Sequence, residues 1–145
     1  MHPKRIILSA ALAALALLAL PTFAVESLSA GQLDAASRVL TGTAECEFNQ
    51  KVSLTPLAGQ PGHFKLGYKQ TSYTVVPQET TTGAVRLEDR KAGIVWLQIP
   101  AKSMLMNAKV GQRLVDGCTL AEQRADQAAQ APVESSTLGI AVAPR

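Results

Sequence analysis

The chain has 145 residues, 47% of them hydrophobic, which suffices for the core of one domain but not comfortably for two. Its 14 Lys and Arg residues outnumber its 11 Asp and Glu residues, but two of the basic residues, Lys4 and Arg5, stand near the start. Beyond residue 24 the chain has twelve basic and eleven acidic residues, and the charges are interspersed. A nucleic-acid partner, which would require a clustered basic face, therefore gains no support and is not expected.

Residues 1–24 have the layout of a secretory signal peptide. After the basic residues comes an uncharged run rich in Ala and Leu over residues 6–20, and then small residues at Thr22 and Ala24 that fit a cleavage site. A transmembrane helix is the alternative, but fifteen apolar residues fall short of the roughly 20 that span hydrocarbon. No Cys follows the run, so a lipid anchor is not expected. We predict cleavage after Ala24 and a periplasmic or secreted mature protein with no membrane anchor.

Cys46 and Cys118 are the only cysteines, and both follow the predicted signal peptide. In an oxidising compartment a disulfide is the default expectation for such a pair, with two free thiols as the alternative. The bond would close a loop of about 72 residues and remove unfolded-chain entropy worth about 4 kcal/mol. It would also leave no thiol for catalysis. Two Cys and the single His beyond residue 24 cannot form a structural zinc site, so no metal is expected.

Residues 25–43 are predicted to form an N-terminal helical segment. Ser29 and Gln32 stand at capping-box spacing, and Leu28 and Leu33 are placed as a hydrophobic staple. Gly42 is the expected end of the helix. We interpret the segment as a helix that packs on the domain, in preference to one that binds a partner.

Beyond Cys46 the pattern changes to alternating residues rich in β-formers, broken at short intervals by Gly, Pro and Asn. Seven strands are predicted, over residues 51–56, 63–68, 71–76, 84–88, 93–99, 103–106 and 112–115. The fold class is therefore all-β. We expect residues 44–120 to form a small antiparallel β-barrel or a sandwich closed by the disulfide, because both arrangements deal with exposed sheet edges. Trp96 lies on a strand with two apolar faces and is interpreted as core, with a ligand platform as the alternative.

Residues 121–145 are predicted to be a tail that is first partly helical and then disordered. The stretch over residues 120–131 is rich in Ala and Gln, which indicates a frayed helix. Residues 132–145 are small, polar and interrupted by Pro, a composition that cannot bury enough apolar surface to fold.

Catalytic motifs are not apparent in the sequence. His63 is the only His beyond residue 24, and the chain has no nucleophile elbow, no phosphate-binding glycine loop and no paired His. We therefore expect a protein that is not an enzyme and holds no cofactor. A small hydrolase is an alternative that depends wholly on His63.

Two predicted loops are candidate contact sites. The first, residues 79–83, is rich in hydroxyl groups and precedes a strand that carries Arg86; the second, residues 100–103, contains Lys102. Hydroxyl donors and cations on rigid loops complement an acidic, carbohydrate-binding cleft, where they pair with carboxylates. The alternative is that these are ordinary solvated turns.

The same loops carry a resemblance to a known family. Together with the disulfide and the lone tryptophan, the pattern resembles the membrane-bound and periplasmic inhibitors of c-type lysozyme, over about residues 44–120. The residues that carry this resemblance are Thr82, Gly83, Ala84, Arg86, Trp96, Lys102 and Cys118. Members of that family are small exported β-barrels with one disulfide. Their Ser-Gly-Ala loop and a later Trp-x-Lys segment occlude the lysozyme active site.

The resemblance implies a role for each matching residue. Cys46 and Cys118 would form the family disulfide, and Thr82 with Gly83 would stand for the Ser-Gly pair. Arg86 and Lys102 would offer positive charge to the catalytic carboxylates of a c-type lysozyme. The alternative is a non-enzymatic envelope protein of the same fold that binds a cell-wall component or another envelope protein.

Overall fold

The computed structural model describes residues 27–131. The predicted signal peptide, residues 1–24, and the predicted disordered stretch, residues 132–145, lie outside these described residues. No helix among residues 27–131 has the length and apolar character needed to cross a membrane.

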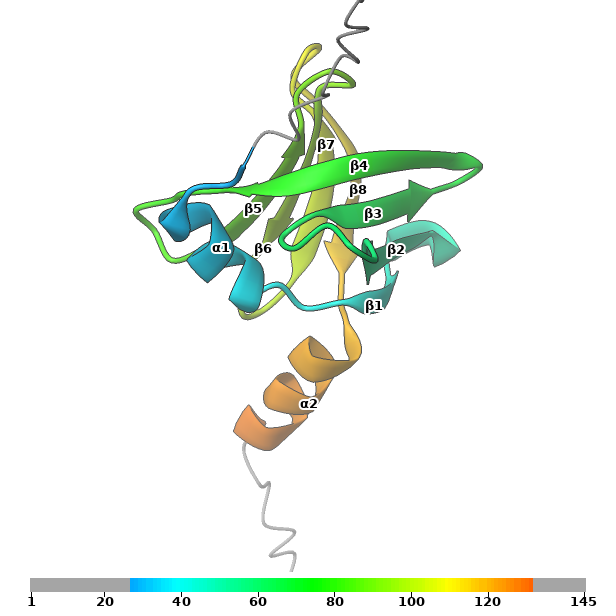
Figure 1. Cartoon of the computed structure of the whole chain (residues 1–145). Coiled ribbons are helices and arrows are strands. Elements are labelled where there is room, and N and C mark those ends of the chain that lie inside the picture. Colours follow the sequence, from blue (N-terminus) through cyan, green and yellow to red (C-terminus); the bar gives the residue numbers. More distant parts are fainter. Residues whose placement is uncertain (1–26, 132–145) are drawn as a thin grey trace, which may run out of the picture.

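A single antiparallel sheet of eight strands makes up most of the described chain, with one helix before it and one after it (Figure 1). The strands are β1 (Gly42–Glu45), β2 (Lys51–Pro56), β3 (Phe64–Tyr68), β4 (Thr71–Gln78), β5 (Val85–Asp89), β6 (Ile94–Gln98), β7 (Ser103–Asn107) and β8 (Gln112–Cys118). The helices are α1 (Ala30–Ser37), the 3-10 helix η1 (Glu47–Asn49) and α2 (Ala121–Gln130).

The sheet curls into a nearly closed barrel. Each strand pairs with the next in the order β1 to β8. The barrel closes where Glu45 and Thr119 exchange backbone hydrogen bonds of 3.0 and 2.8 Å between β1 and the residue after β8. The predicted all-β fold is confirmed, as a barrel, and the seven predicted strands correspond to β2–β8. Prediction missed β1, which is four residues long and buries only Ala44.

The disulfide lies at this seam. Cys46 directly follows β1 and Cys118 ends β8, and their Cα atoms are 3.9 Å apart. The predicted Cys46–Cys118 bond is thus present. It joins the first and last strands where only one pair of backbone residues connects them, so it holds the barrel closed.

Alternation along the strands fills the barrel interior. Leu87, Trp96 and Leu105 face one another in register on β5, β6 and β7, and all three have no exposed surface. Trp96 is therefore core, as predicted. Among the described residues its indole Nε1 is the one buried side-chain nitrogen or oxygen without a hydrogen-bond partner.

The connections divide the barrel into two ends, because neighbouring strands run in opposite directions. One end, which we call the loop end, holds the connections over residues 57–63, 79–84 and 99–102, and both α1 and α2 adjoin it (Figure 1). The other, the turn end, holds η1 and the turns between β3 and β4, β5 and β6, and β7 and β8.

Helix α1 begins as predicted. The Ser29 hydroxyl accepts from the Gln32 N–H and the Gln32 amide oxygen accepts from the Ser29 N–H, both at 3.0 Å, which completes the capping box. Leu28 and Leu33 pack together over Gly62, where an added Cβ would lie 2.5 and 3.2 Å from their methyl groups. The helix therefore docks on the connection between β2 and β3.

The predicted end of this helix at Gly42 is wrong, because α1 ends at Ser37. Residues 38–41 instead run across the loop end of the barrel. There the buried Gln98 side chain accepts from the Leu40 N–H at 3.0 Å and donates to the Leu40 carbonyl at 2.7 Å. This pairing draws the chain out of the helix and into β1.

Candidate binding site at the loop end of the barrel

The connection between β4 and β5, residues 79–84, forms a tight turn that we call the hydroxyl loop. The Thr80 hydroxyl donates to the Ala84 carbonyl at 2.6 Å and closes the turn. At its tip Thr82 and Gly83 are exposed. Gly83 has φ of 77°, a left-handed conformation that favours glycine. The tip therefore presents a hydroxyl group and bare backbone to solvent.

Helix α1 braces this loop from the side. Arg38, which caps the helix, donates from Nη1 to the Gly83 carbonyl at 3.2 Å. Its other terminal nitrogen lies 3.6 Å from the Asp34 carboxylate. The loop tip is thus tied to the N-terminal helix, a contact that the sequence did not predict.

The connection between β6 and β7, residues 99–102, is the second predicted contact loop, and we call it the lysine loop. The Ile99 N–H donates to the Lys102 carbonyl at 2.9 Å. Because Gln98 pairs with both Val85 and Ser103 in register, the lysine loop lies at the same barrel end as the hydroxyl loop. Thr82, Gly83 and Lys102 therefore share the loop end.

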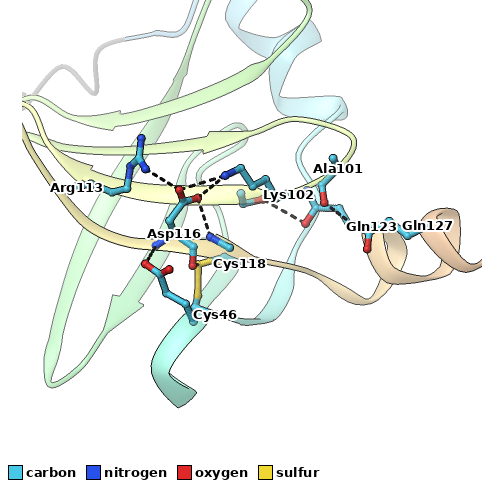
Figure 2. Close-up of polar contacts among 11 residues, drawn as sticks. Cys46, Ala101, Lys102, Arg113, Asp116, Cys118, Gln123 and Gln127 are labelled. Atoms are coloured by element: carbon cyan, nitrogen blue, oxygen red, sulfur yellow. Dashed lines mark hydrogen bonds and ion pairs between the residues drawn. A yellow bond between two sulfur atoms is a disulfide. The ribbon is translucent and has the colours of Figure 1, made fainter.

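The Lys102 side chain turns toward β8 and remains 41% exposed (Figure 2). Its Nζ lies 3.0 and 3.1 Å from the two carboxylate oxygens of Asp116. Arg113 pairs with the same carboxylate at 2.8 Å. One carboxylate thus serves two cations.

Asp116 is held ionised by its surroundings. Its side chain is only 12% exposed, and it accepts from the Gly117 N–H at 2.7 Å. That backbone hydrogen bond lowers the pKa of Asp116 below its ordinary value, and Lys102 and Arg113 lower it further, against the opposing effect of burial. The Asp116 N–H in turn donates to Glu47 at 3.0 Å, close to the disulfide.

Helix α2 covers the other side of the lysine loop. The buried Gln123 amide donates to the Ile99 carbonyl at 2.7 Å and to the Ser103 hydroxyl at 3.1 Å, and Gln127 donates to the Ala101 carbonyl (Figure 2). The lysine loop is therefore fixed from two sides, by α2 and by Asp116. Gln123 and Asp116 were not singled out from the sequence, since nothing in their neighbourhood shows that strand pairing brings them to this loop.

Arg86 stands one residue inside β5 and faces outward from the barrel wall. It pairs with the Glu88 carboxylate, which also lies 3.6 Å from Arg90. Here again two cations share one carboxylate. Arg86 is close to the hydroxyl loop in sequence, but its side chain is directed along the wall toward Glu88, and the loop tip lies beyond it.

His63 lies in a different place, a groove of about 470 Å³ between α1 and β4 that Ser29 and Glu79 also line. The Ser29 hydroxyl donates to Glu79 at 2.7 Å, and His63 Nδ1 faces the Pro61 carbonyl at 3.2 Å. The groove therefore shows no serine paired with its histidine. Within residues 27–131 no three His, Cys, Asp or Glu side chains gather in a way that could hold a metal ion.

Comparisons of the chain with protein-family models, with curated proteins and with solved structures find no match.

Proposed function

We propose that this chain is an exported, non-enzymatic binding protein whose loop end binds the active-site cleft of a c-type lysozyme and blocks it. The observation that carries the proposal is the meeting of the hydroxyl loop and the lysine loop at one end of a disulfide-closed barrel. The disulfide also supports export, because such bonds persist in oxidising compartments. The resemblance described above supplies the partner.

The loop end has the chemistry that such a cleft requires. The exposed tip at Thr82 and Gly83 has no bulky side chain, so it fits a narrow cleft, and its hydroxyl is a donor for a catalytic carboxylate. Lys102 stands at the same end, where it shares the Asp116 carboxylate with Arg113. On the adjoining wall Arg86 and Arg90 share the Glu88 carboxylate. Cations at a contact surface pair with the carboxylates of an acidic cleft and orient its approach.

The proposal predicts that Thr82→Asp weakens inhibition, because the new carboxylate would face the carboxylates of the lysozyme. A like charge at a desolvated contact costs several kcal/mol, so the loss of inhibition should exceed about tenfold. The measurement is the clearance of a peptidoglycan suspension by a c-type lysozyme, with the mature protein in excess.

Gln112→Asp is the matched control, since it adds the same charge on an exposed residue at the turn end. This control should inhibit as the unchanged protein does. The proposal fails if the unchanged protein leaves lysis unaltered, and the contact lies elsewhere if the two variants inhibit equally.

A second candidate partner is another envelope component, either a cell-wall component or an envelope protein. The observation that favours it is that both predicted contact cations already form ion pairs inside this protein. Arg86 pairs with Glu88, and Lys102 pairs with Asp116. A partner without paired carboxylates would leave these ion pairs intact. A salt-sensitive pull-down from envelope extract, in parallel with a c-type lysozyme, separates the candidates by which of the two is retained.

A further inference from the structure

The outer face of β1–β4 is a second surface, separate from the loop end. It is hollowed, with a volume of about 460 Å³, and we call it the basic face. Its lining residues are Thr43, Lys51, Ser53, Thr55, Lys65, Gly67, Lys69, Gln70, Thr71 and Ser72. All of them are exposed except Gly67, which is half-buried. No other element of the described chain covers this face.

Strand register arranges the basic face in rows. Thr43, Ser53, Gly67 and Ser72 stand opposite one another across the four strands. Beside this row Lys65 lies between Thr55 and Thr74. Thr43, Ser53, Lys65 and Gly67 each adjoin a buried residue, and Ser72 adjoins the partly buried Tyr73, so the row points outward.

The middle of the face is open because of Gly67. A Cβ at this position would lie 2.5 Å from the Ser53 hydroxyl oxygen. Any larger residue would therefore fill the floor of the hollow. The hydroxyl groups that donate hydrogen bonds within the described chain lie elsewhere, on Ser29, Ser37, Tyr68, Thr80 and Ser103. The Ser and Thr hydroxyls of the basic face are thus available to a ligand.

The charge of this face is positive. Lys51 pairs with Glu45 at 3.1 Å, whereas Lys65 and Lys69 have no carboxylate within 4.0 Å among the described residues. Lys69 Nζ lies 5.2 Å from the centre of the Tyr68 ring, which holds it at the turn end of the face. Lys65 lies on β3, and Lys69 lies in the turn that follows it. Two unpaired cations thus flank a floor of hydroxyl groups.

An exposed aromatic residue lies in the connection between β1 and β2, two of the strands that form this face. Phe48 lies in η1, the connection between β1 and β2, and is 85% exposed. Its φ of 56° and that of Asn49, 55°, are left-handed, a costly conformation for a bulky residue. An aromatic side chain held in solvent at this cost is suited to stacking on a flat ligand surface.

We propose that the basic face binds an anionic polysaccharide, a sugar chain that carries carboxylate, phosphate or sulfate groups. Lys65 and Lys69 pair with the anionic groups, the Ser and Thr hydroxyls bond the sugar hydroxyls, and Phe48 stacks on a sugar ring. The proposal does not depend on the loop end, because the two surfaces share no residue. It gives the protein a way to be retained in a layer of anionic glycan while its loop end stays free.

The test compares three polymers binding to the mature protein at low salt: dextran sulfate, neutral dextran and inorganic polyphosphate. Dextran sulfate should bind most tightly, neutral dextran should not bind, and polyphosphate should bind more weakly because it cannot use the hydroxyls or Phe48. An exposed ion pair contributes up to about 1 kcal/mol, so Lys65→Gln with Lys69→Gln should weaken dextran sulfate binding about tenfold. Phe48→Ala should weaken it about fivefold and leave polyphosphate binding unchanged.

The matched control changes two lysines at the turn end, Lys91→Gln with Lys109→Gln, which are exposed and lie outside the face. This control should bind dextran sulfate as the unchanged protein does, and all variants should keep the same melting temperature. Absence of dextran sulfate binding, an equal loss in the control, or polyphosphate binding as tight as that of dextran sulfate would each overturn the proposal. Inhibition of lysozyme should be unaffected by Lys65→Gln with Lys69→Gln, so the two surfaces are tested separately.

Discussion

Asp116 connects the loop end of the barrel to the disulfide seam. It accepts from the Gly117 N–H and from Lys102 and Arg113, and its own N–H donates to Glu47, the residue after Cys46. Loss of the Asp116 charge would therefore release Lys102 as well as the end of β8. This carboxylate is the residue whose ionisation matters most for the candidate site.

The lowered pKa of Asp116 makes a prediction about acid stability. Because the folded state favours the charged carboxylate, its contribution is present above the unfolded Asp value of about 3.9 and is lost as pH falls through the lower folded value. Asp116→Asn should remove this contribution. The difference in free energy of unfolding between the two proteins should be largest near neutral pH and shrink below about pH 4.

Urea denaturation at several pH values measures this difference. Asp34→Asn is a suitable control, since that carboxylate is exposed and pairs only loosely with Arg38. A gap between Asp116→Asn and the unchanged protein that stays constant from neutral pH to pH 2 would contradict the account.

Gln98 makes a second prediction at the scale of single residues. Its buried amide satisfies both the N–H and the carbonyl of Leu40. Gln98→Leu replaces the amide with an apolar side chain of similar size and removes both hydrogen bonds, so it should lower the free energy of unfolding by about 2 kcal/mol. Gln112→Leu, on an exposed residue of β8, should change it by less than about 0.5 kcal/mol. Thermal or urea denaturation measures the stability of the two variants. Equal stability of Gln98→Leu and Gln112→Leu would contradict the role given to Gln98.

Single residues were the least predictable part of the site. The hydroxyl loop and Lys102 could be found in the sequence, because Gly83 and Pro100 indicate turns and the Thr residues and Lys102 lie beside them. The inward direction of Gln98 also follows from its alternation with Trp96. The partners of Lys102 and Arg86 could not be predicted, because Asp116 reaches Lys102 only through pairing of β7 with β8, which local sequence does not specify.

The seam between β1 and β8 is the weakest join among the elements of the barrel. One pair of residues, Glu45 and Thr119, carries its backbone hydrogen bonds, while the other neighbouring strands pair over several residues. The Cys46–Cys118 bond lies beside this pair. The disulfide therefore takes the place of the additional backbone hydrogen bonds that join the other neighbouring strands.

Removal of the disulfide should be strongly destabilising. The bond closes a loop with a sequence separation of 72, for which the chain-entropy argument gives about 4 kcal/mol. Cys46→Ala with Cys118→Ala should therefore lower the free energy of unfolding by about 2–5 kcal/mol, measured by urea denaturation. Hydrogen exchange should show the first opening at β1 and at the end of β8. A loss below about 1 kcal/mol, or first opening at β5 and β6, would contradict the role of the bond at the seam.

Elements with a strong local pattern were predictable and those without one were not. The capping box at Ser29 and the alternation in β2–β8 are local signals, and both appear in the structure. The strand β1 and the early end of α1 depend on contacts with distant residues, Thr119 and Gln98. The Gly42 that suggested a helix end instead begins β1 with φ of 119°.

The whole molecule presents two separate surfaces on one barrel. The loop end holds a small hydroxyl tip and a braced lysine loop, and the basic face on β1–β4 holds Lys65 and Lys69 over a floor of hydroxyls. Up-and-down connections put alternate loops at one end, which is why residues 20 positions apart in sequence meet there. The binding function we propose depends on the loop end.

The most direct test of that function is a titration of the isotope-labelled mature protein with a c-type lysozyme, followed by amide NMR. We predict saturable shifts or broadening confined to the hydroxyl loop, the lysine loop and the adjoining end of α1, with the residues of the basic face and the turn end unchanged. The absence of any change at a stoichiometric excess of lysozyme, or changes centred on the turn end, would contradict the proposal.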